Sequence, residues 1–165
     1  MPNLWHVRCF LCPDEFFAYL FGRQGFKLLA QAMIADPLSI LITDDDAGFR
    51  ETLREVIAPQ GFRTLLAGDG QEALEIVHRQ DVHLLLLDMH MPRLTGLETI
   101  ERVKRFNAEL PCILLSARAD EQLIEQALRV QAFAVLPKPV SRQRIIDSVR
   151  QALQRAYNWR ERHLS

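Results

Sequence analysis

Four short apolar runs in the chain each lead to polar side chains, and this pattern is the strongest constraint on the fold. The runs 39–43, 84–87, 112–115 and 133–136 lead to Asp44, Asp88, Ser116 and Lys138, in that order. Short apolar runs without polar alternation are typical of strands in a parallel sheet that helices cover on both faces. Because the carboxyl ends of parallel strands lie at one edge of the sheet, we expect carboxylates, a hydroxyl and an ammonium from distant segments to meet there.

Apolar residues recur at helical spacing between these runs, which predicts helices. The predicted strands are 38–43, 62–67, 83–88, 112–116 and 133–136, and the predicted helices are 47–58, 70–80, 96–106, 119–130 and 142–157. Asp69, Thr95 and Ser141 are residue types that cap helices. Strands that alternate with helices predict an α/β fold with a doubly wound sheet and right-handed crossovers. Pro137 favours an edge position for the last strand because proline lacks a backbone N–H.

Composition narrows the class of protein. A chain of 165 residues with 48% hydrophobic residues has enough material for one domain with a core, plus an arm or tail. The net charge of -1 gives no general attraction to nucleic acid or to an anionic membrane. Three cysteines do not suggest a disulfide framework, which favours a reducing, cytoplasmic setting. No apolar run reaches the roughly 18 residues that a membrane span needs.

The residue order indicates three parts: an arm at 1–37, a compact domain at 38–158 and a tail at 159–165. Asp36-Pro37 marks the first boundary because a residue before proline is disfavoured in helix. The arm is rich in aromatic and aliphatic residues, so a docked helix, a self-association element and a membrane-surface helix remain open. An equal alternative is that Met33 is the true initiator, in which case the arm has no function. Cys9 and Cys12 are interpreted as packing residues because zinc needs four ligands.

The polar residues at the strand ends suggest a specific chemistry. Carboxylates that share one crevice repel each other unless a cation lies among them. Mg²⁺ suits such a site because it prefers oxygen ligands and often combines one or two carboxylates with phosphate oxygens. A carboxylate can also accept a phosphoryl group covalently. Lys138 and the metal would neutralise charge on the transferred group, while Ser116 would donate a hydrogen bond to it.

Four segments, in this order, resemble the receiver domain of two-component response regulators. They are ILITDDDAGFR, LLLLDMHMPRLTG, ILLSA and LPKP, and the resemblance covers about residues 38–156. It implies a flavodoxin-like sheet of five parallel strands in the order 2-1-3-4-5. It also implies a signalling protein that catalyses only its own phosphorylation and dephosphorylation. The phosphoryl donor would be a partner histidine kinase or a His-containing phosphotransfer protein.

The resemblance assigns roles by position. Asp88 matches the phosphoacceptor, and Asp44 and Asp45 match the acidic pair that organises Mg²⁺, with Asp45 the favoured direct ligand. His90 falls where the family offers a backbone carbonyl to the metal. Ser116 matches the switch hydroxyl. Lys138 matches the lysine that contacts the phosphoryl group, and the Lys138–Pro139 peptide resembles a usual cis bond of the family.

Some positions depart from the usual pattern of the family, and others are ones that modulate its hydrolysis reaction. Val135 stands at the switch position where members often carry an aromatic residue, and alternation predicts that Phe133 faces the same side. His90 and Arg118 follow Asp88 and Ser116 by two residues, at positions that flank the phosphoryl group and modulate hydrolysis. We hypothesise that Arg118 sets the lifetime of the phosphorylated form. By contrast, Arg50 is interpreted as a surface charge on its helix.

The first hypothesis is therefore a stand-alone receiver with no output domain and no direct nucleic-acid contact. It would act on a protein target through the surface of its fourth helix, fifth strand and fifth helix, or pass its phosphoryl group onward in a phosphorelay. An aspartyl-phosphate hydrolase of the haloacid dehalogenase type is a second hypothesis. Members of that class have a second Asp two residues after the nucleophile, where this chain has His90. A degenerate receiver that only binds a partner is a third, which intact Asp45, Asp88 and Lys138 argue against.

Overall fold

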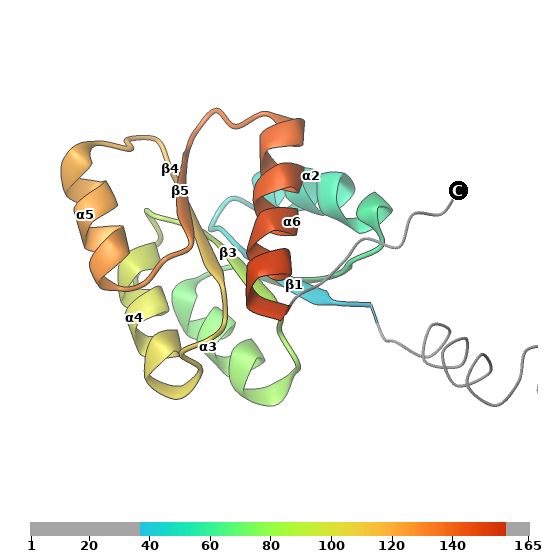
Figure 1. The fold of residues 1–165 in the computed structure, drawn as a ribbon, viewed down its shortest axis with the longest axis horizontal. Helices are drawn as coiled ribbons and strands as arrows, with labels where there is room; N and C mark the ends of the chain where they lie inside the picture. The colour runs from blue at the N-terminus through green and yellow to red at the C-terminus, as the bar shows by residue number, and fades with distance from the viewer. Residues whose placement is uncertain (1–36, 158–165) are drawn as a thin grey trace, which may run out of the picture. The chain divides into compact units, whose positions relative to one another are not determined.

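The computed structural model describes residues 37–157, which contain one parallel sheet of five strands in the order β2-β1-β3-β4-β5 (Figure 1). The strands are β1 (Ser39–Thr43), β2 (Arg63–Ala67), β3 (Leu84–Asp88), β4 (Cys112–Ser116) and β5 (Ala134–Pro137). This topology confirms the predicted doubly wound, flavodoxin-like sheet. β5 lies at an edge of the sheet, as the neighbouring proline predicted.

Five α-helices and one short 3-10 helix connect the described strands. They are α2 (Ala47–Ile57), η1 (Ala58–Gln60), α3 (Gly70–Arg79), α4 (Gly96–Phe106), α5 (Glu121–Arg129) and α6 (Arg142–Tyr157). The side chains of Asp46, Asp69, Thr95 and Asp120 accept backbone N–H bonds at the starts of α2 to α5. Ser141 does the same for α6, with 3.2 Å between Arg144 N and Ser141 Oγ. The caps predicted at Asp69, Thr95 and Ser141 are therefore confirmed.

The sheet has a hydrophobic core on each face, which explains why its strands read as unbroken apolar runs. Ile40 and Ile42 pack with side chains of α2 and α6, whereas Leu41 packs with side chains of α3, α4 and α5 on the opposite face. All three side chains are fully buried. Burial of a side chain of this size contributes about 1.5–3 kcal/mol. These strands therefore hold their carboxyl ends in fixed positions.

Strand pairing brings the predicted site residues to one edge. Thr43 in β1 pairs with Leu87 in β3, so the residues that end or follow these strands are close neighbours. Ser116 at the end of β4 pairs with Pro137 in β5. The strand order reverses around β1, and ligands of such sheets bind in the crevice beyond the strand ends at this switch point.

One local prediction is wrong. Phe133 and Val135 do not face the same side, because Phe133 packs with the core cluster of α2 and α6 and Val135 with that of α3, α4 and α5. The reason is that β5 begins at Ala134, so the two-residue alternation of a strand does not extend back to Phe133. The predictions about the arm, Met33, Cys9, Cys12 and the tail concern residues outside the described range. Within residues 37–157, no helix is both long enough and apolar enough to cross a membrane.

Candidate functional site

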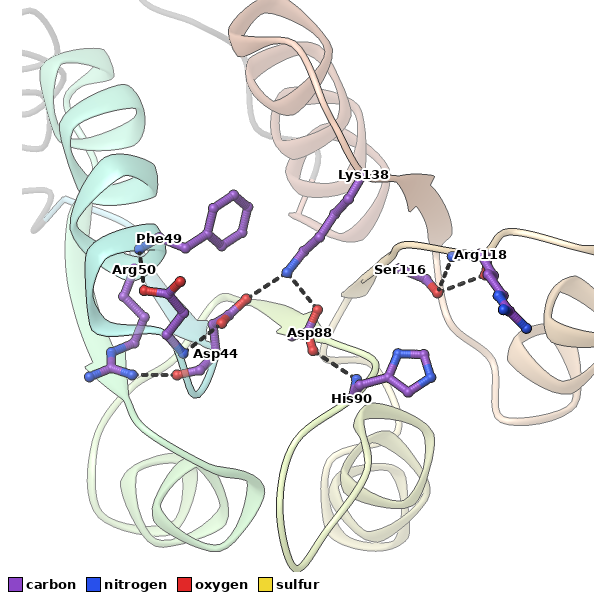
Figure 2. A network of polar contacts seen from close by, with 9 residues as sticks. Asp44, Phe49, Arg50, Asp88, His90, Ser116, Arg118 and Lys138 are labelled. Atoms are coloured by element: carbon purple, nitrogen blue, oxygen red, sulfur yellow. Dashed lines mark hydrogen bonds and ion pairs between the residues drawn. The ribbon is translucent and has the colours of Figure 1, made fainter.

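Lys138 joins two acidic residues at the carboxyl edge of the sheet (Figure 2). Its Nζ lies 2.8 Å from Asp44 Oδ2 and 2.6 Å from Asp88 Oδ1. The side chains of Asp44 and Asp88 are only 3% and 9% exposed, whereas that of Lys138 is 24% exposed. The fold thus brings two buried carboxylates to one ammonium, although these residues are far apart in sequence.

Charge compensation holds this cluster together. Burial by itself lowers the pKa of Lys138, but hydrogen bonds to Asp44 and Asp88 and their negative charges outweigh it and raise the pKa above 10.5. Lys138 therefore carries its positive charge at neutral pH. Two carboxylates taken out of water need such a partner, since a buried charge without one is costly. The cluster is an electrostatic unit rather than three independent surface charges.

Asp44 is fixed by its own loop as well as by Lys138. Its Oδ1 accepts a hydrogen bond of 2.9 Å from Asp46 N, and its backbone carbonyl accepts one from Arg50 Nη1. The interpretation of Arg50 as a surface charge is wrong, because its half-buried side chain binds the main chain of the acidic loop. Only the spacing after the aspartates, one turn into α2, would have hinted at this contact.

Asp88 is held on both of its carboxylate oxygens. Oδ1 contacts Lys138, and Oδ2 accepts a hydrogen bond of 2.7 Å from His90 N. The backbone of His90 thus lies against the acidic cluster, while its side chain belongs to an exposed residue. The start of α4 is also close, because a Cβ on Gly96 would lie 2.4 Å from the Asp88 carbonyl oxygen. Only glycine permits this approach.

Ser116 is fully buried, yet its hydroxyl is engaged away from the carboxylates. Ser116 Oγ donates to Arg118 O at 2.7 Å and accepts from Arg118 N at 3.2 Å, as the dashed lines in Figure 2 mark. Its carbonyl accepts a hydrogen bond of 2.7 Å from Lys138 N. The main chains of Ser116 and Lys138 are therefore joined, while the hydroxyl must rotate before it can bind a group at Asp88.

A small hollow lies beside the acidic cluster. It has a volume of about 230 Å³, and its lining includes His90, Ser116, Arg118 and Asp120. Arg118 is an exposed residue on the β4–α5 side, and His90 belongs to the β3–α4 loop. The two residues predicted to modulate hydrolysis therefore border the same space.

Asp45 and Val135 make none of the described polar contacts of the cluster. Asp45 is exposed, and among the described residues no hydrogen bond or ion pair joins it to Asp88 or Lys138. Val135 is half-buried in β5 and packs against the core. The Lys138–Pro139 peptide is cis, as the resemblance predicted. The roles assigned to Asp45 in metal binding and to Val135 in switching stay predictions.

Whether the site can hold a divalent cation depends on the oxygen donors that its side chains provide. Within residues 37–157, no three Asp, Glu, His or Cys side chains gather in a metal-binding arrangement. The two carboxylates of Asp44 and Asp88 do meet, and both are bound to one cationic nitrogen. Mg²⁺ commonly uses only one or two carboxylates and keeps several waters. The donor set therefore fits Mg²⁺, with a lysine cation between the carboxylates.

Two contacts of the site had no clear signal in the sequence. The Lys138 ammonium lies 4.1 Å from the centre of the Phe49 ring. Arg93, in the loop after Asp88, forms an ion pair with the capping carboxylate of Asp69. Helical spacing indicates that Phe49 is a core residue, but it does not indicate that the ring contacts the lysine that follows β5. Such contacts depend on side chains from distant segments.

Comparison with known proteins identifies the family. The family model of the response regulator receiver domain matches residues 40–150. The chain is 37% identical over 118 residues to the response regulator MprA of Mycobacterium leprae, covering 72% of this chain and 52% of that protein. It is 33% identical over 114 residues to sporulation initiation phosphotransferase F of Bacillus subtilis, covering 69% of this chain and 92% of that protein. The chain belongs to the response regulator receiver family.

Solved structures agree with this fold. The chemotaxis protein CheY4 of Vibrio cholerae superposes with a TM-score of 0.69 at 22% identity, covering 71% of this chain and 99% of that one. A CheY-like receiver domain protein of Methanospirillum hungatei gives a TM-score of 0.71 at 21% identity, with coverages of 74% and 98%. These structures share the fold of this chain, and the family match identifies it as a receiver domain of two-component systems. The chain spans about half the length of MprA.

Proposed function

We propose that Asp88 accepts a phosphoryl group from a phosphohistidine and that this modification switches the protein between signalling states. The observation that supports this proposal most is the arrangement at Asp88, a buried carboxylate bound by Lys138 and by His90 N. A relative that the match covers to 92% of its length is named sporulation initiation phosphotransferase F. The donor would be a histidine kinase or a His-containing phosphotransfer protein of a two-component or phosphorelay pathway in the cytoplasm.

The reaction is a phosphoryl transfer between two side chains. A carboxylate oxygen of Asp88 forms a bond to phosphorus, the phosphorus–nitrogen bond of the phosphohistidine breaks, and the imidazole leaves with its electron pair. Lys138 offsets negative charge on the transferred oxygens. Ser116 Oγ exchanges its bond to Arg118 O for one to a phosphoryl oxygen. Positioning and electrostatic stabilisation supply most of the catalysis in such transfers.

A magnesium ion belongs to this proposal. Asp44, Asp45, Asp88 and the backbone carbonyl of His90 would hold it, and when bound it would neutralise charge on the transferred phosphoryl group. Asp44 is well placed for this role because its carboxylate already lies within reach of the same ammonium as Asp88. Lys138 must then share or yield Asp44, which its long side chain permits.

Arg118 and His90 are proposed to tune the lifetime of the phosphorylated form. Both border the hollow of about 230 Å³ beside Asp88. An attacking water that enters through this hollow would meet the Arg118 guanidinium, which is large and cationic. Arg118 would hinder or orient that water and so set the rate of hydrolysis.

The surface of α5, β5 and α6 is proposed to bind a downstream protein. This surface, predicted above as that of the fourth helix, fifth strand and fifth helix, carries the exposed apolar side chains Ile124 and Leu128 on α5, which are 43% and 68% exposed. Its strand β5 begins at Ala134, three residues after Gln131, which has a φ of 58°, and it ends beside Lys138. Rotation of the Ser116 side chain at the end of β4 would affect this surface through the adjacent strand β5. This route does not need an aromatic residue at position 135, where the chain has valine.

The experiment is phosphorylation by acetyl phosphate in the presence of Mg²⁺, followed by intact-mass measurement. One phosphoryl group adds about 80 Da, through a bond that hydroxylamine and base cleave. Asp88→Asn is expected to abolish the increase. Asp46→Asn is the matched acidic control, because asparagine can also cap α2 and the Asp46 side chain has no contact with Asp88 or Lys138 among those described. Persistence of the increase in Asp88→Asn would contradict the proposal. Many turnovers of a small phosphorylated substrate would instead indicate the hydrolase hypothesis.

A further inference from the structure

Phe49 supplies the third neighbour of the Lys138 ammonium, and nothing in the proposed function uses it. Its ring centre lies 4.1 Å from Lys138 Nζ, while Asp44 Oδ2 and Asp88 Oδ1 lie at 2.8 and 2.6 Å from the same atom. Figure 2 shows the ring and the two carboxylates on different sides of the ammonium. A cation within about 6 Å of an aromatic ring centre is attracted by the negative face of the ring.

The ring is fixed by the same turn that fixes the acidic residues. Phe49 N donates a hydrogen bond of 3.1 Å to Asp46 Oδ1, and Asp46 N donates one of 2.9 Å to Asp44 Oδ1. Phe49 is half-buried and packs against the core cluster of α2 and α6. The start of α2 and the core cluster therefore hold the ring through contacts that do not involve the lysine.

The position of the Lys138 ammonium, by contrast, is not fixed by its own side chain. Its flexible stem crosses from the end of β5 to residues that end or follow β1 and β3, and the ammonium can follow its partners in many rotamers. In the proposed reaction both carboxylates would change partner, because Asp44 would help to hold the metal ion and Asp88 would become a mixed anhydride. The aromatic face of Phe49 is the one contact of the ammonium described above whose charge distribution stays the same throughout.

We propose that Phe49 is a positioning residue, which holds the Lys138 ammonium over the site while Asp44 and Asp88 exchange their partners. This inference rests on the proposed phosphorylation of Asp88 and adds a residue to it. A leucine at this position would keep apolar packing but lose the attraction to the cation. A tyrosine would keep both.

The first test compares phosphorylation rates with acetyl phosphate and Mg²⁺. Phe49→Leu is expected to lower the rate roughly three- to tenfold, and Phe49→Tyr to change it less than twofold. Phe133→Leu is the matched control, since Phe133 is also half-buried and packs against the same core cluster. Equal losses in Phe49→Leu and Phe133→Leu would overturn the inference, because both would then reflect packing alone.

A second test reduces the negative charge on the face of the aromatic ring and nearly keeps the shape of the ring. Phenylalanine with one, two or three ring fluorines, incorporated at position 49, weakens the attraction for a cation step by step. The phosphorylation rate is expected to fall with each added fluorine. A rate that stays constant across the series would overturn the inference, since a purely structural role is insensitive to this change.

A third measurement does not depend on phosphorylation. Protons near an aromatic face shift upfield in NMR spectra, so the ε-methylene protons of Lys138 should be upfield in the wild type and return to ordinary values in Phe49→Leu. Unchanged shifts would overturn the contact itself. Upfield shifts in a protein that acetyl phosphate does not modify would instead contradict the proposed function and leave the contact standing.

Discussion

The two sides of the site differ in how firmly their neighbours hold them. On the β1–β3 side, both oxygens of Asp88 and both oxygens of Asp44 accept hydrogen bonds or ion pairs. On the β4–α5 side, Ser116 Oγ bonds only to the backbone of Arg118, and α5 carries the exposed side chain of Leu128. The first side presents a preorganised acceptor, whereas the second has groups that can change partners without leaving a buried charge.

This difference suggests a division of labour within one domain. A phosphoryl acceptor benefits from fixed geometry, because misplacement of reacting groups is costly in rate. A signalling surface benefits from alternative arrangements of similar free energy, because a ligand can shift only such an equilibrium. The predictions below compare the two sides, from the largest expected effect to the smallest.

Gly96→Ala is expected to cause the largest loss of stability. The added Cβ would lie 2.4 Å from the Asp88 carbonyl oxygen and 2.5 Å from Leu114 Cδ1, so the start of α4 must shift. We expect a decrease of about 3 kcal/mol in the free energy of unfolding, measured with urea. Gly68→Ala is the control, because its Cβ would meet nothing closer than 3.5 Å. Similar losses in both variants would contradict a tightly packed β3–α4 junction.

Lys138→Met is expected to destabilise the protein by about 2 kcal/mol, because it leaves two buried carboxylates without their cation. Partial exposure of Lys138 places this value below that of a fully buried pair. Arg118→Met, on the exposed side of the hollow, is expected to change the free energy of unfolding by less than about 0.5 kcal/mol. If Lys138→Met left the free energy of unfolding unchanged, the stability of the cluster would not depend on the ammonium.

Stability should also fall at alkaline pH through Lys138. Although burial lowers its pKa, hydrogen bonds to Asp44 and Asp88 raise it above 10.5. The folded protein then binds the proton more tightly than the unfolded chain, so this contribution is complete below about pH 10.4 and is lost as pH rises through the folded pKa. Burial raises the pKa of Tyr157, and it raises the pKa of Cys112 to about 12, so both groups also lose stabilisation at alkaline pH and the double variant Tyr157→Phe, Cys112→Ala is the background for this measurement. Lys138→Met should remove the remaining alkaline loss, and an unchanged loss would contradict this assignment.

Arg118→Ala is expected to change the half-life of phosphorylated Asp88 several-fold and leave stability nearly unchanged. The reason is that Arg118 borders the hollow beside Asp88 and is itself exposed. The half-life is measured from the decay of the protein mass after acetyl phosphate is removed. Arg142→Ala at the start of α6, an exposed arginine on another element, is the control. Equal half-lives in Arg118→Ala and wild type would end the hypothesis.

Leu128→Ala should have the smallest effect on the isolated domain. The side chain is 68% exposed, so its removal is expected to change the free energy of unfolding by less than about 0.5 kcal/mol. If the α5 surface binds a partner, the same change should weaken binding measurably. Loss of stability above 1 kcal/mol would show that Leu128 supports the fold rather than a partner surface.

The fold was largely predictable because its elements depend on local patterns. Pro111 and the apolar residues after it predicted β4 at its observed bounds, 112–116. The start of β5 was less clear, since Phe133 continues the apolar run but packs on the other face from Val135. Strand ends also predicted that Asp44, Asp88, Ser116 and Lys138 share an edge.

The partners within the site were harder to predict. Parallel pairing places strand ends together but does not specify which side chains contact each other. Lys138 and Asp44 are 94 residues apart, and their contact depends on rotamers at both ends. The sequence likewise did not reveal that Arg50 binds the main chain of Asp44 or that Phe49 lies beneath an ammonium. These details follow from packing between elements, which local patterns do not encode.

The most direct test of the account is to locate the phosphoryl group. Sodium borohydride reduces an aspartyl phosphate to homoserine, and peptide mass spectrometry then identifies the modified residue. After treatment with acetyl phosphate and Mg²⁺, homoserine is predicted at position 88 alone, the residue held by Lys138 and His90 N. Homoserine at Asp44 or Asp45, or its appearance in Asp88→Asn, would contradict the central claim.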